Sequence, residues 1–281
     1  MSLWKAIVLG IVQGLTEFLP VSSSGHLSIT QLLLKVPEDR IFFLTVMLHV
    51  GTLFSVMVVY RQDLWRIIVA FFQMCNDLAH RRGLGLENEY RRLGLFIIVG
   101  TIPTGIMGLL LKDAISAVYA SRLVIGFSLL ITGTLLWMAE RSQPFKNKNP
   151  KTLQQMTWKN ALAVGVFQGF AITPGISRSG STIAGALFQG INKETATRYS
   201  FLLSFPAILA ATLLETKDAF AYGMGDVTVP VLLAGILASF LAGVFAIRAL
   251  INLIKRERLY YFSFYTWTIG LGTIAAALLW R

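Results

Sequence analysis

The chain has 281 residues, of which 55% are hydrophobic and only 14% are charged, with a formal net charge of +11. Ordinary soluble domains carry about 25% charged residues, and several apolar stretches here approach the roughly 20 residues that an α-helix needs to cross a bilayer. The composition therefore predicts an all-α polytopic membrane protein surrounded by membrane lipid. The single cysteine, Cys75, excludes a disulfide within the chain and any cysteine-based metal site.

Six stretches are long and apolar enough to be transmembrane helices. They are Ile41–Tyr60, Leu93–Leu111, Val118–Ala139, Tyr199–Glu215, Val227–Ile254 and Leu259–Trp280. Lysines and arginines gather in three connecting segments, 61–92, 140–159 and 248–258, and the positive-inside rule makes these segments cytoplasmic. This distribution places both termini on the outer side of the membrane, and it explains the net positive charge without a nucleic-acid partner.

Two further segments, 3–36 and 158–191, do not fit a simple span. Each consists of an apolar half-helix, a break rich in proline, serine and glycine, and a second half-helix. We interpret both as re-entrant helical hairpins. Non-helical backbone at membrane depth is tolerated only when it is buried in protein or lines a wet cavity, so the two breaks are expected to mark a polar site.

The two hairpins follow one pattern, which is visible in WKAIVLGIVQGLTEFLPVSSSG and WKNALAVGVFQGFAITPGISRSG. Gln13 lies 12 residues before Gly25, and Gln168 lies 12 residues before Gly180, which gives a repeat with an offset of 155 residues. The parts of this single integral membrane domain, 1–281, are then repeat 1 (1–139), a cytoplasmic linker (140–157) and repeat 2 (158–281). Because each repeat contains three spans, the second copy must be inverted, and such inverted-topology repeats place their polar site near the bilayer midplane.

The tip of the second hairpin, TPGISRSGST at 173–182, predicts an anion site. The half-helix that begins there would direct free N–H groups and its positive dipole end at the tip, and the planar guanidinium of Arg178 matches two phosphate oxygens at once. The hydroxyl groups that would add donors are those of Ser177, Ser179, Ser181 and Thr182. The alternative is a structural helix break in which Arg178 snorkels or pairs with a carboxylate, although intramembrane charges are usually functional.

The first tip carries polar groups of another kind. Gln13 and Glu17 are four residues apart, so they share a helix face. A buried Glu17 needs a partner, which we expect to be Arg178 or a divalent cation, because oxygen ligands of this kind suit Mg²⁺ or Ca²⁺. A structural ion pair for Glu17 and a bond between helices for Gln13 are the alternatives.

The same tip contains candidate nucleophiles. His26 follows Ser22, Ser23 and Ser24 closely in sequence. A histidine in this place could act as a base or as a phosphate-accepting nucleophile, and a serine could act as a nucleophile or as a hydrogen-bond donor. The sequence leaves the choice between Ser23 and His26 open.

Other polar and small residues are expected to have structural roles. His49 is expected to hydrogen-bond between helices, and Arg198 is expected to anchor its span at the membrane interface. Gly100, Gly105 and Gly108 are expected at close contacts between helices.

The motifs QGLTEFLPVSSSGH and PGISRSGST resemble the two signature motifs of the undecaprenyl-diphosphatase family, which are bacterial membrane enzymes associated with bacitracin resistance. Both motifs occur in order and in the hairpin positions, and the likeness extends over the whole chain. One position departs from the commonest pattern, because many members carry glutamate where this chain has Gln13. That substitution removes one negative charge from the site.

The resemblance implies that a long-chain isoprenyl diphosphate, undecaprenyl diphosphate, is hydrolysed to undecaprenyl phosphate and inorganic phosphate, which recycles the lipid carrier for peptidoglycan synthesis. It places the reaction near the outer face of the bacterial cytoplasmic membrane, with the help of a divalent cation, and it leaves a homodimer open. The roles that it implies are cation binding or activation for Glu17, nucleophile or base for Ser23 and His26, and a phosphate clamp for Arg178 with Ser177 and Thr182. We add Gln13, Ser22 and Ser179 as expected substrate contacts.

A transporter or flippase is the alternative function. Paired inverted hairpins are a common frame for alternating access, and a polar cavity with an arginine could carry a lipid phosphate or a small anion. The combination of Glu, Ser, His and Arg favours catalysis, since a carrier needs no nucleophile.

Overall fold

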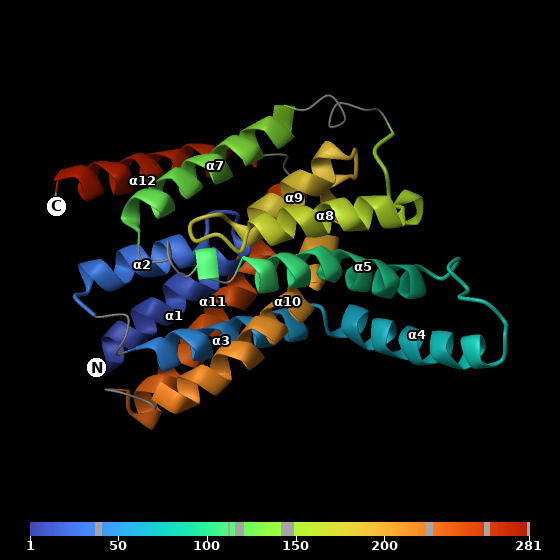
Figure 1. Ribbon diagram of the computed structural model, residues 1–281, viewed down its shortest axis with the longest axis horizontal. Coiled ribbons are helices and arrows are strands. Elements are labelled where there is room, and N and C mark those ends of the chain that lie inside the picture. The colour runs from blue at the N-terminus through green and yellow to red at the C-terminus, as the bar shows by residue number, and fades with distance from the viewer. Residues whose placement is uncertain are drawn as a thin grey trace.

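The computed structural model of the chain describes residues 1–36, 41–111, 113–115, 121–141, 149–222, 227–255 and 259–279. Within these ranges the regular structure is helical, apart from one isolated bridge between Lys151 and Ile191. The named elements (Figure 1) are α1 (Leu3–Phe18), α2 (Ser23–Leu33), α3 (Phe42–Val59), α4 (Arg61–Ala79), α5 (Glu89–Leu110), α7 (Arg122–Arg141), η2 (Leu153–Gln155), α8 (Trp158–Phe170), α9 (Arg178–Phe188), α10 (Lys193–Tyr222), α11 (Val229–Lys255) and α12 (Tyr260–Leu279). Parts of two predicted spans (118–120 and 280) and part of the predicted linker (142–148) lie outside the described residues.

Within the described ranges, six helices are long and apolar enough to cross a membrane, as the sequence predicted. They are α3, α5, α7, α10, α11 and α12. The largest difference from the predicted bounds is at α10, which extends from Lys193 to Tyr222 rather than from Tyr199 to Glu215. Asn192 caps its polar first turn, since its Oδ1 accepts the N–H of Thr195 at 2.7 Å. A search for apolar stretches alone misses a turn of this kind.

The segment 61–92, which was expected to be a connecting loop, contains the additional helix α4. This helix packs against α5, and its Ala70 and Met74 are buried. Other side chains of α4 are open, since Trp65 and Phe72 are each 67% exposed. Because charged residues interrupt its apolar face, α4 is amphipathic rather than uniformly apolar, and it is not one of the six candidate spans among the described residues.

Two pairs of shorter helices, α1–α2 and α8–α9, occupy the predicted hairpin segments. They contain 16, 11, 13 and 11 residues, and each is shorter than the roughly 20 residues needed for a full crossing. The helices of each pair pack against one another, and the two tips meet near the middle of the molecule (Figure 1). The lengths agree with the predicted half-helices, while the re-entrant course and the inversion of the repeat stay predictions.

The two halves of the chain exchange packing partners. Helix α1 packs along α11, and α8 packs along α5, so the first helix of each half lies on a span of the other half. At these contacts, a Cβ atom added to Gly10 would overlap the carbonyl oxygen of Gly235, and one added to Gly165 would overlap that of Gly100. Gly10 and Gly165 are equivalent positions at the offset of 155 residues, so the repeated glycine has a packing reason.

The three glycines predicted at helix contacts differ in their surroundings. A Cβ on Gly100 would lie 2.5 Å from the hydroxyl of Tyr199, which confirms a close contact. One on Gly108 would make an ordinary contact of 3.4 Å with Ile172, whereas one on Gly105 would meet no described atom within 4 Å. The prediction for Gly105 is therefore wrong, because this face of α5 is not covered by a neighbouring helix of the described chain.

The main hydrophobic core lies directly behind the first hairpin tip. Phe18, the last residue of α1, is fully buried, and its ring meets that of Phe201 edge-on at 5.7 Å between centroids. Tyr199 is buried in the same cluster, and its hydroxyl donates to the carbonyl of Phe96 at 2.7 Å. These contacts join α1, α5 and α10, so the tip of the first hairpin rests on a packed base.

Candidate active site at the hairpin tips

The two hairpin tips touch, as the sequence analysis expected. The backbone N–H of Gly175 in the second tip donates to Ser24 Oγ in the first tip at 3.1 Å. In a second bond from the second tip to the first, Ser179 Oγ donates to the carbonyl oxygen of Leu19 at 3.2 Å. These bonds join residues that are 151 and 160 positions apart in the chain, so the polar groups of both tips face a common site.

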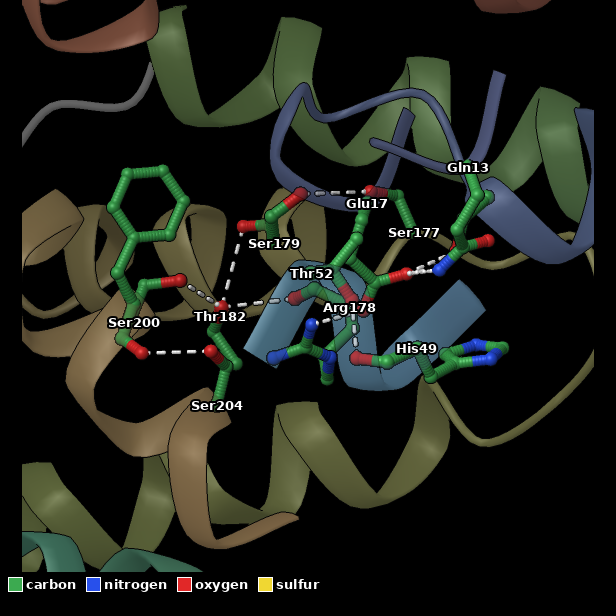
Figure 2. A network of polar contacts seen from close by, with 12 residues as sticks. Gln13, Glu17, His49, Thr52, Ser177, Arg178, Ser179, Thr182, Ser200 and Ser204 are labelled. Carbon is green, nitrogen blue, oxygen red and sulfur yellow. Dashed lines mark hydrogen bonds and ion pairs between the residues drawn. The ribbon is translucent and has the colours of Figure 1, made fainter. Parts of the chain in front are cut away.

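Glu17, in the last turn of α1, is the centre of this site. Its side chain is only 6% exposed, and its Oε1 forms an ion pair with Arg178 Nη2 at 2.5 Å. Its other oxygen, Oε2, accepts a hydrogen bond from Ser23 Oγ at 2.6 Å. The same oxygen accepts a bond from Gln13 Nε2 at 2.9 Å (Figure 2). Arg178 is therefore the partner that a buried Glu17 requires, and charge-assisted bonds occupy both carboxylate oxygens.

Ser22 and Ser177 each cap the second helix of a hairpin. Ser22 Oγ accepts the N–H of Gly25 at 3.3 Å, and Ser177 Oγ accepts the N–H of Gly180 at 3.1 Å. This N-cap geometry explains why serine and glycine recur at the same spacing in both repeats. Ser22 has a φ of 75°, which is unfavourable for a residue with a side chain and is found most often at functional sites.

The remaining hydroxyl groups of α9 are directed into the protein. Thr182 Oγ1 donates to the carbonyl of Arg178 at 2.8 Å and lies 2.6 Å from Ser200 Oγ on α10. Ser177, Ser179 and Thr182 are each no more than 3% exposed, whereas the side chain of Arg178 is 18% exposed. The guanidinium is therefore better placed than these hydroxyl groups to meet an incoming anion, and the hydroxyl groups hold α9 in position.

His26 lies at the same tip but belongs to a separate group of contacts. Its Nδ1 is 2.7 Å from the carbonyl oxygen of Ser22, and its Nε2 is 2.8 Å from the hydroxyl of Tyr265 on α12. Among the contacts of the described residues, none joins the imidazole to Glu17 or Arg178. The site thus has one group around Glu17 and another around His26, connected through the adjacent residues Ser22 and Ser23.

Two expectations outside the tips are corrected by the structure. His49 was expected to bond between helices, but its Nδ1 lies 2.9 Å from the carbonyl oxygen of Thr45 in its own helix. Arg198 was expected to be a simple interfacial anchor. Its guanidinium instead pairs with Asp63 at 2.7 Å and with Glu89 at 2.6 Å, and so it ties α10 to α4 and α5.

The side-chain oxygen atoms of Gln13 and Glu17 suit a divalent cation that takes most of its ligands from phosphate and water. Gln13 Oε1 is buried without a hydrogen-bond partner in the described part of the chain, and it belongs to the side chain that bonds to Glu17. Amide and carboxylate oxygens are ligands of Mg²⁺ and Ca²⁺. The described residues include no group of three His, Cys, Asp or Glu side chains able to hold a metal. A cation here would therefore need phosphate oxygens and water, which is common for Mg²⁺.

Comparison with known proteins identifies the family of the chain. The model of the family described as bacitracin resistance protein BacA matches residues 6–272. The chain belongs to this family. It is 61% identical to an undecaprenyl-diphosphatase of Alkaliphilus metalliredigens over 279 residues, which are 99% of this chain and 100% of that protein. Undecaprenyl-diphosphatases of Halothermothrix orenii and Desulforapulum autotrophicum are 44% and 42% identical, over 99% and 98% of this chain and 99% of each of those proteins. The family resemblance predicted from the two motifs is confirmed.

Three residues that support the site in this BacA family member were not predicted. Tyr265 contacts His26, Ser200 contacts Thr182, and Thr132 Oγ1 on α7 accepts the N–H of Ser177 at 3.0 Å. All three lie in apolar spans outside the two motifs, between 18 and 239 positions from the residues they contact. Isolated Ser, Thr and Tyr residues are common in such spans, so the sequence carries no signal that separates these three from the others.

Proposed function

We propose that the protein hydrolyses undecaprenyl diphosphate to undecaprenyl phosphate and inorganic phosphate, and that it thereby recycles the lipid carrier of peptidoglycan synthesis. Membership of the family and the shared name of the similar proteins support this reaction. The observation that carries the proposal at the atomic scale is that Glu17 bonds to Ser23 and to Arg178 at once. Glu17, the proton acceptor of the proposal, is therefore bonded both to the nucleophile, Ser23, and to the cationic phosphate ligand, Arg178.

In the first step, Ser23 attacks the terminal phosphorus of the diphosphate. Its hydroxyl already donates to Glu17 Oε2 at 2.6 Å, so the carboxylate is placed to take the proton as the Oγ–P bond forms. The bond between the terminal phosphorus and the bridging oxygen breaks, and the prenyl monophosphate leaves with that oxygen. Arg178 has five N–H donors, of which the ion pair uses one on Nη2, and the others stabilise charge on the transferring phosphoryl group.

In the second step, water releases the phosphate from Ser23. The water attacks the phosphoserine phosphorus, the Oγ–P bond breaks, Glu17 returns its proton to Ser23 Oγ, and the protons of the water leave with the inorganic phosphate. The net reaction consumes one water and converts one diphosphate into two monophosphates. The bonding of Glu17 to Ser23 favours serine over His26 as the nucleophile, because both ring nitrogens of His26 are bonded elsewhere.

A divalent cation, Mg²⁺ or Ca²⁺, is part of this proposal. Gln13 Oε1 and the carboxylate of Glu17 would hold it, and it would neutralise charge on the diphosphate. Because Gln13 contributes no charge, the protein supplies a single carboxylate, and the affinity for the free cation is expected to be weaker than the affinity in the presence of substrate.

The proposed setting is the bacterial cytoplasmic membrane, with the lipid tail among the spans and the head group at the hairpin tips. The basic segments define the cytoplasmic side. Figure 1 shows both chain ends at the same end of the molecule, which supports placing them together on the outer side.

Phosphate release from a long-chain isoprenyl diphosphate by the purified protein in detergent tests the proposed activity. We expect steady release by the unmodified protein, at least about a hundredfold slower release by Ser23→Ala, and normal release by Ser28→Ala, a control serine on the same helix. A transporter of lipid phosphate would release none. Normal turnover by Ser23→Ala would remove Ser23 from the mechanism.

Trapping the intermediate distinguishes the two candidate nucleophiles. Rapid quenching of a reaction with substrate labelled in its terminal phosphate should leave label on the peptide that contains Ser23. Phosphoserine survives acid and is lost in base, whereas phosphohistidine shows the reverse pattern. Acid-labile label attached to His26 would show that His26 is the nucleophile.

A further inference from the structure

The contact between Tyr265 and His26 has a geometry that the proposed reaction does not yet explain. The Tyr265 hydroxyl lies 2.8 Å from His26 Nε2, and the planes of the two rings differ by only 9°, with 5.5 Å between the centroids. The rings are therefore stacked, and the distance between the oxygen and the nitrogen is that of a hydrogen bond between a phenol and an imidazole. The two residues are 239 positions apart.

The partner of the other ring nitrogen determines the role of this bond. His26 Nδ1 is 2.7 Å from the backbone carbonyl of Ser22, and a carbonyl oxygen can only accept. Nδ1 therefore carries a hydrogen, and in the neutral imidazole the lone pair is on Nε2. Tyr265 donates to that lone pair, which is the atom that a base or a nucleophile would use.

We propose that Tyr265 is a positioning residue for His26. Its hydroxyl fixes the orientation of the imidazole and occupies Nε2, so that the lone pair is directed at α12 and not at Ser23. The last helix of the chain thereby holds the tip of the first hairpin in a single arrangement. The part of this inference that concerns turnover rests on the proposed phosphatase activity, whereas the part that concerns the lone pair does not.

Chemical modification of His26 tests the occupied lone pair without reference to activity. Diethyl pyrocarbonate reacts with an unprotonated imidazole nitrogen, and mass spectrometry of the His26 peptide gives the rate at that site. Tyr265→Phe keeps the aromatic ring and removes only the hydroxyl group. We expect His26 to react about fivefold faster in this variant, which matches the loss of one typical hydrogen bond. Tyr261→Phe, which removes a phenol one turn earlier on α12, is the matched control and should leave the rate unchanged.

Steady-state kinetics of the same variants test the positioning role. Tyr265→Phe should lower kcat about fivefold and leave KM unchanged, because His26, which bonds to the carbonyl of Ser22 beside Ser23, then holds the first hairpin tip less firmly while substrate binding is retained. A residue that only packs would change neither the modification rate nor kcat when replaced by phenylalanine.

Three results would overturn the inference or separate it from the proposed function. An unchanged modification rate in Tyr265→Phe would show that the phenol does not occupy Nε2. Faster modification with unchanged kcat would show that the contact exists but does not position His26 for the reaction. If the unmodified protein released no phosphate, the proposed function would fail, and faster modification would still support the occupied lone pair.

Discussion

Glu17 forms more polar contacts than any other predicted catalytic residue, so its structural role and its proposed catalytic role can be tested separately. The ion pair with Arg178 joins α1 to α9, while the bond from Ser23 belongs to the proposed chemistry. Breaking a buried ion pair by removing one partner leaves an uncompensated charge, whereas neutralising both partners is much less costly. A structural and a catalytic role therefore predict different behaviour in a double variant.

Glu17→Gln should lower stability by about 3 kcal/mol, a fall of roughly 6–10 °C in Tm, because the partly buried guanidinium of Arg178 loses its counter-charge. Adding Arg178→Gln should restore most of the lost stability. Phosphate release should stay absent in both single variants and in the double variant. Thermal unfolding in detergent and the release assay measure the two properties. Recovered phosphate release in the double variant would show that the pair is only structural.

At the scale of elements, close contact between α1 and α11 determines where the first hairpin lies. Gly10 faces the backbone of Gly235 so closely that a methyl group would overlap its carbonyl oxygen. Backbone cannot move aside as a flexible side chain can, so the helices would have to separate. The same argument applies to Gly165 against Gly100 in the other half.

Gly10→Ala should therefore lower the free energy of unfolding by about 1–3 kcal/mol, as expected for an added methylene in a tight contact. Gly105→Ala is the matched control on a helix, because a Cβ there would meet no described atom within 4 Å. This control should be neutral or more stable by up to about 1 kcal/mol, since alanine favours a helix over glycine. Thermal unfolding of both variants checks the difference, and equal melting temperatures would contradict the contact.

The residues that the sequence could predict at the site are those with a repeated or charged signature. The spacing of Ser22 and Gly25 recurs in the second hairpin because both copies need the same N-cap, and a buried Glu17 required a partner such as Arg178. The contact of Tyr265 could not be predicted, because it depends on how α12 lies against the first tip. Helix α4 was missed for another reason, since its interrupted apolar face resembles a basic connecting segment.

At the scale of the whole molecule, the reciprocal packing of α1 on α11 and of α8 on α5 is the pattern expected of two interlocked copies. Packing alone does not distinguish copies with the same orientation in the membrane from inverted copies. Three spans in each copy predict inversion, and this topology would place the hairpin tips between the two membrane faces. The predicted inversion therefore determines from which side of the membrane a cysteine at the start of each repeat can be labelled.

Labelling of single cysteines in intact cells tests this topology. Cys75 on α4 is exposed and is the only cysteine of the chain, and its segment is predicted to be cytoplasmic. A membrane-impermeant maleimide should therefore react with it only after lysis.

In a Cys75→Ser background, Ser2→Cys at the start of α1 should react in intact cells, whereas Lys159→Cys at the start of α8 should react only after lysis, because inversion puts the two starts on opposite faces. Ser2 and Lys159 are both exposed, so access does not differ for structural reasons. Labelling of both engineered cysteines from the same side would contradict the inverted repeat, and protection of Ser2→Cys with reaction of Lys159→Cys would reverse the predicted orientation while preserving the inversion.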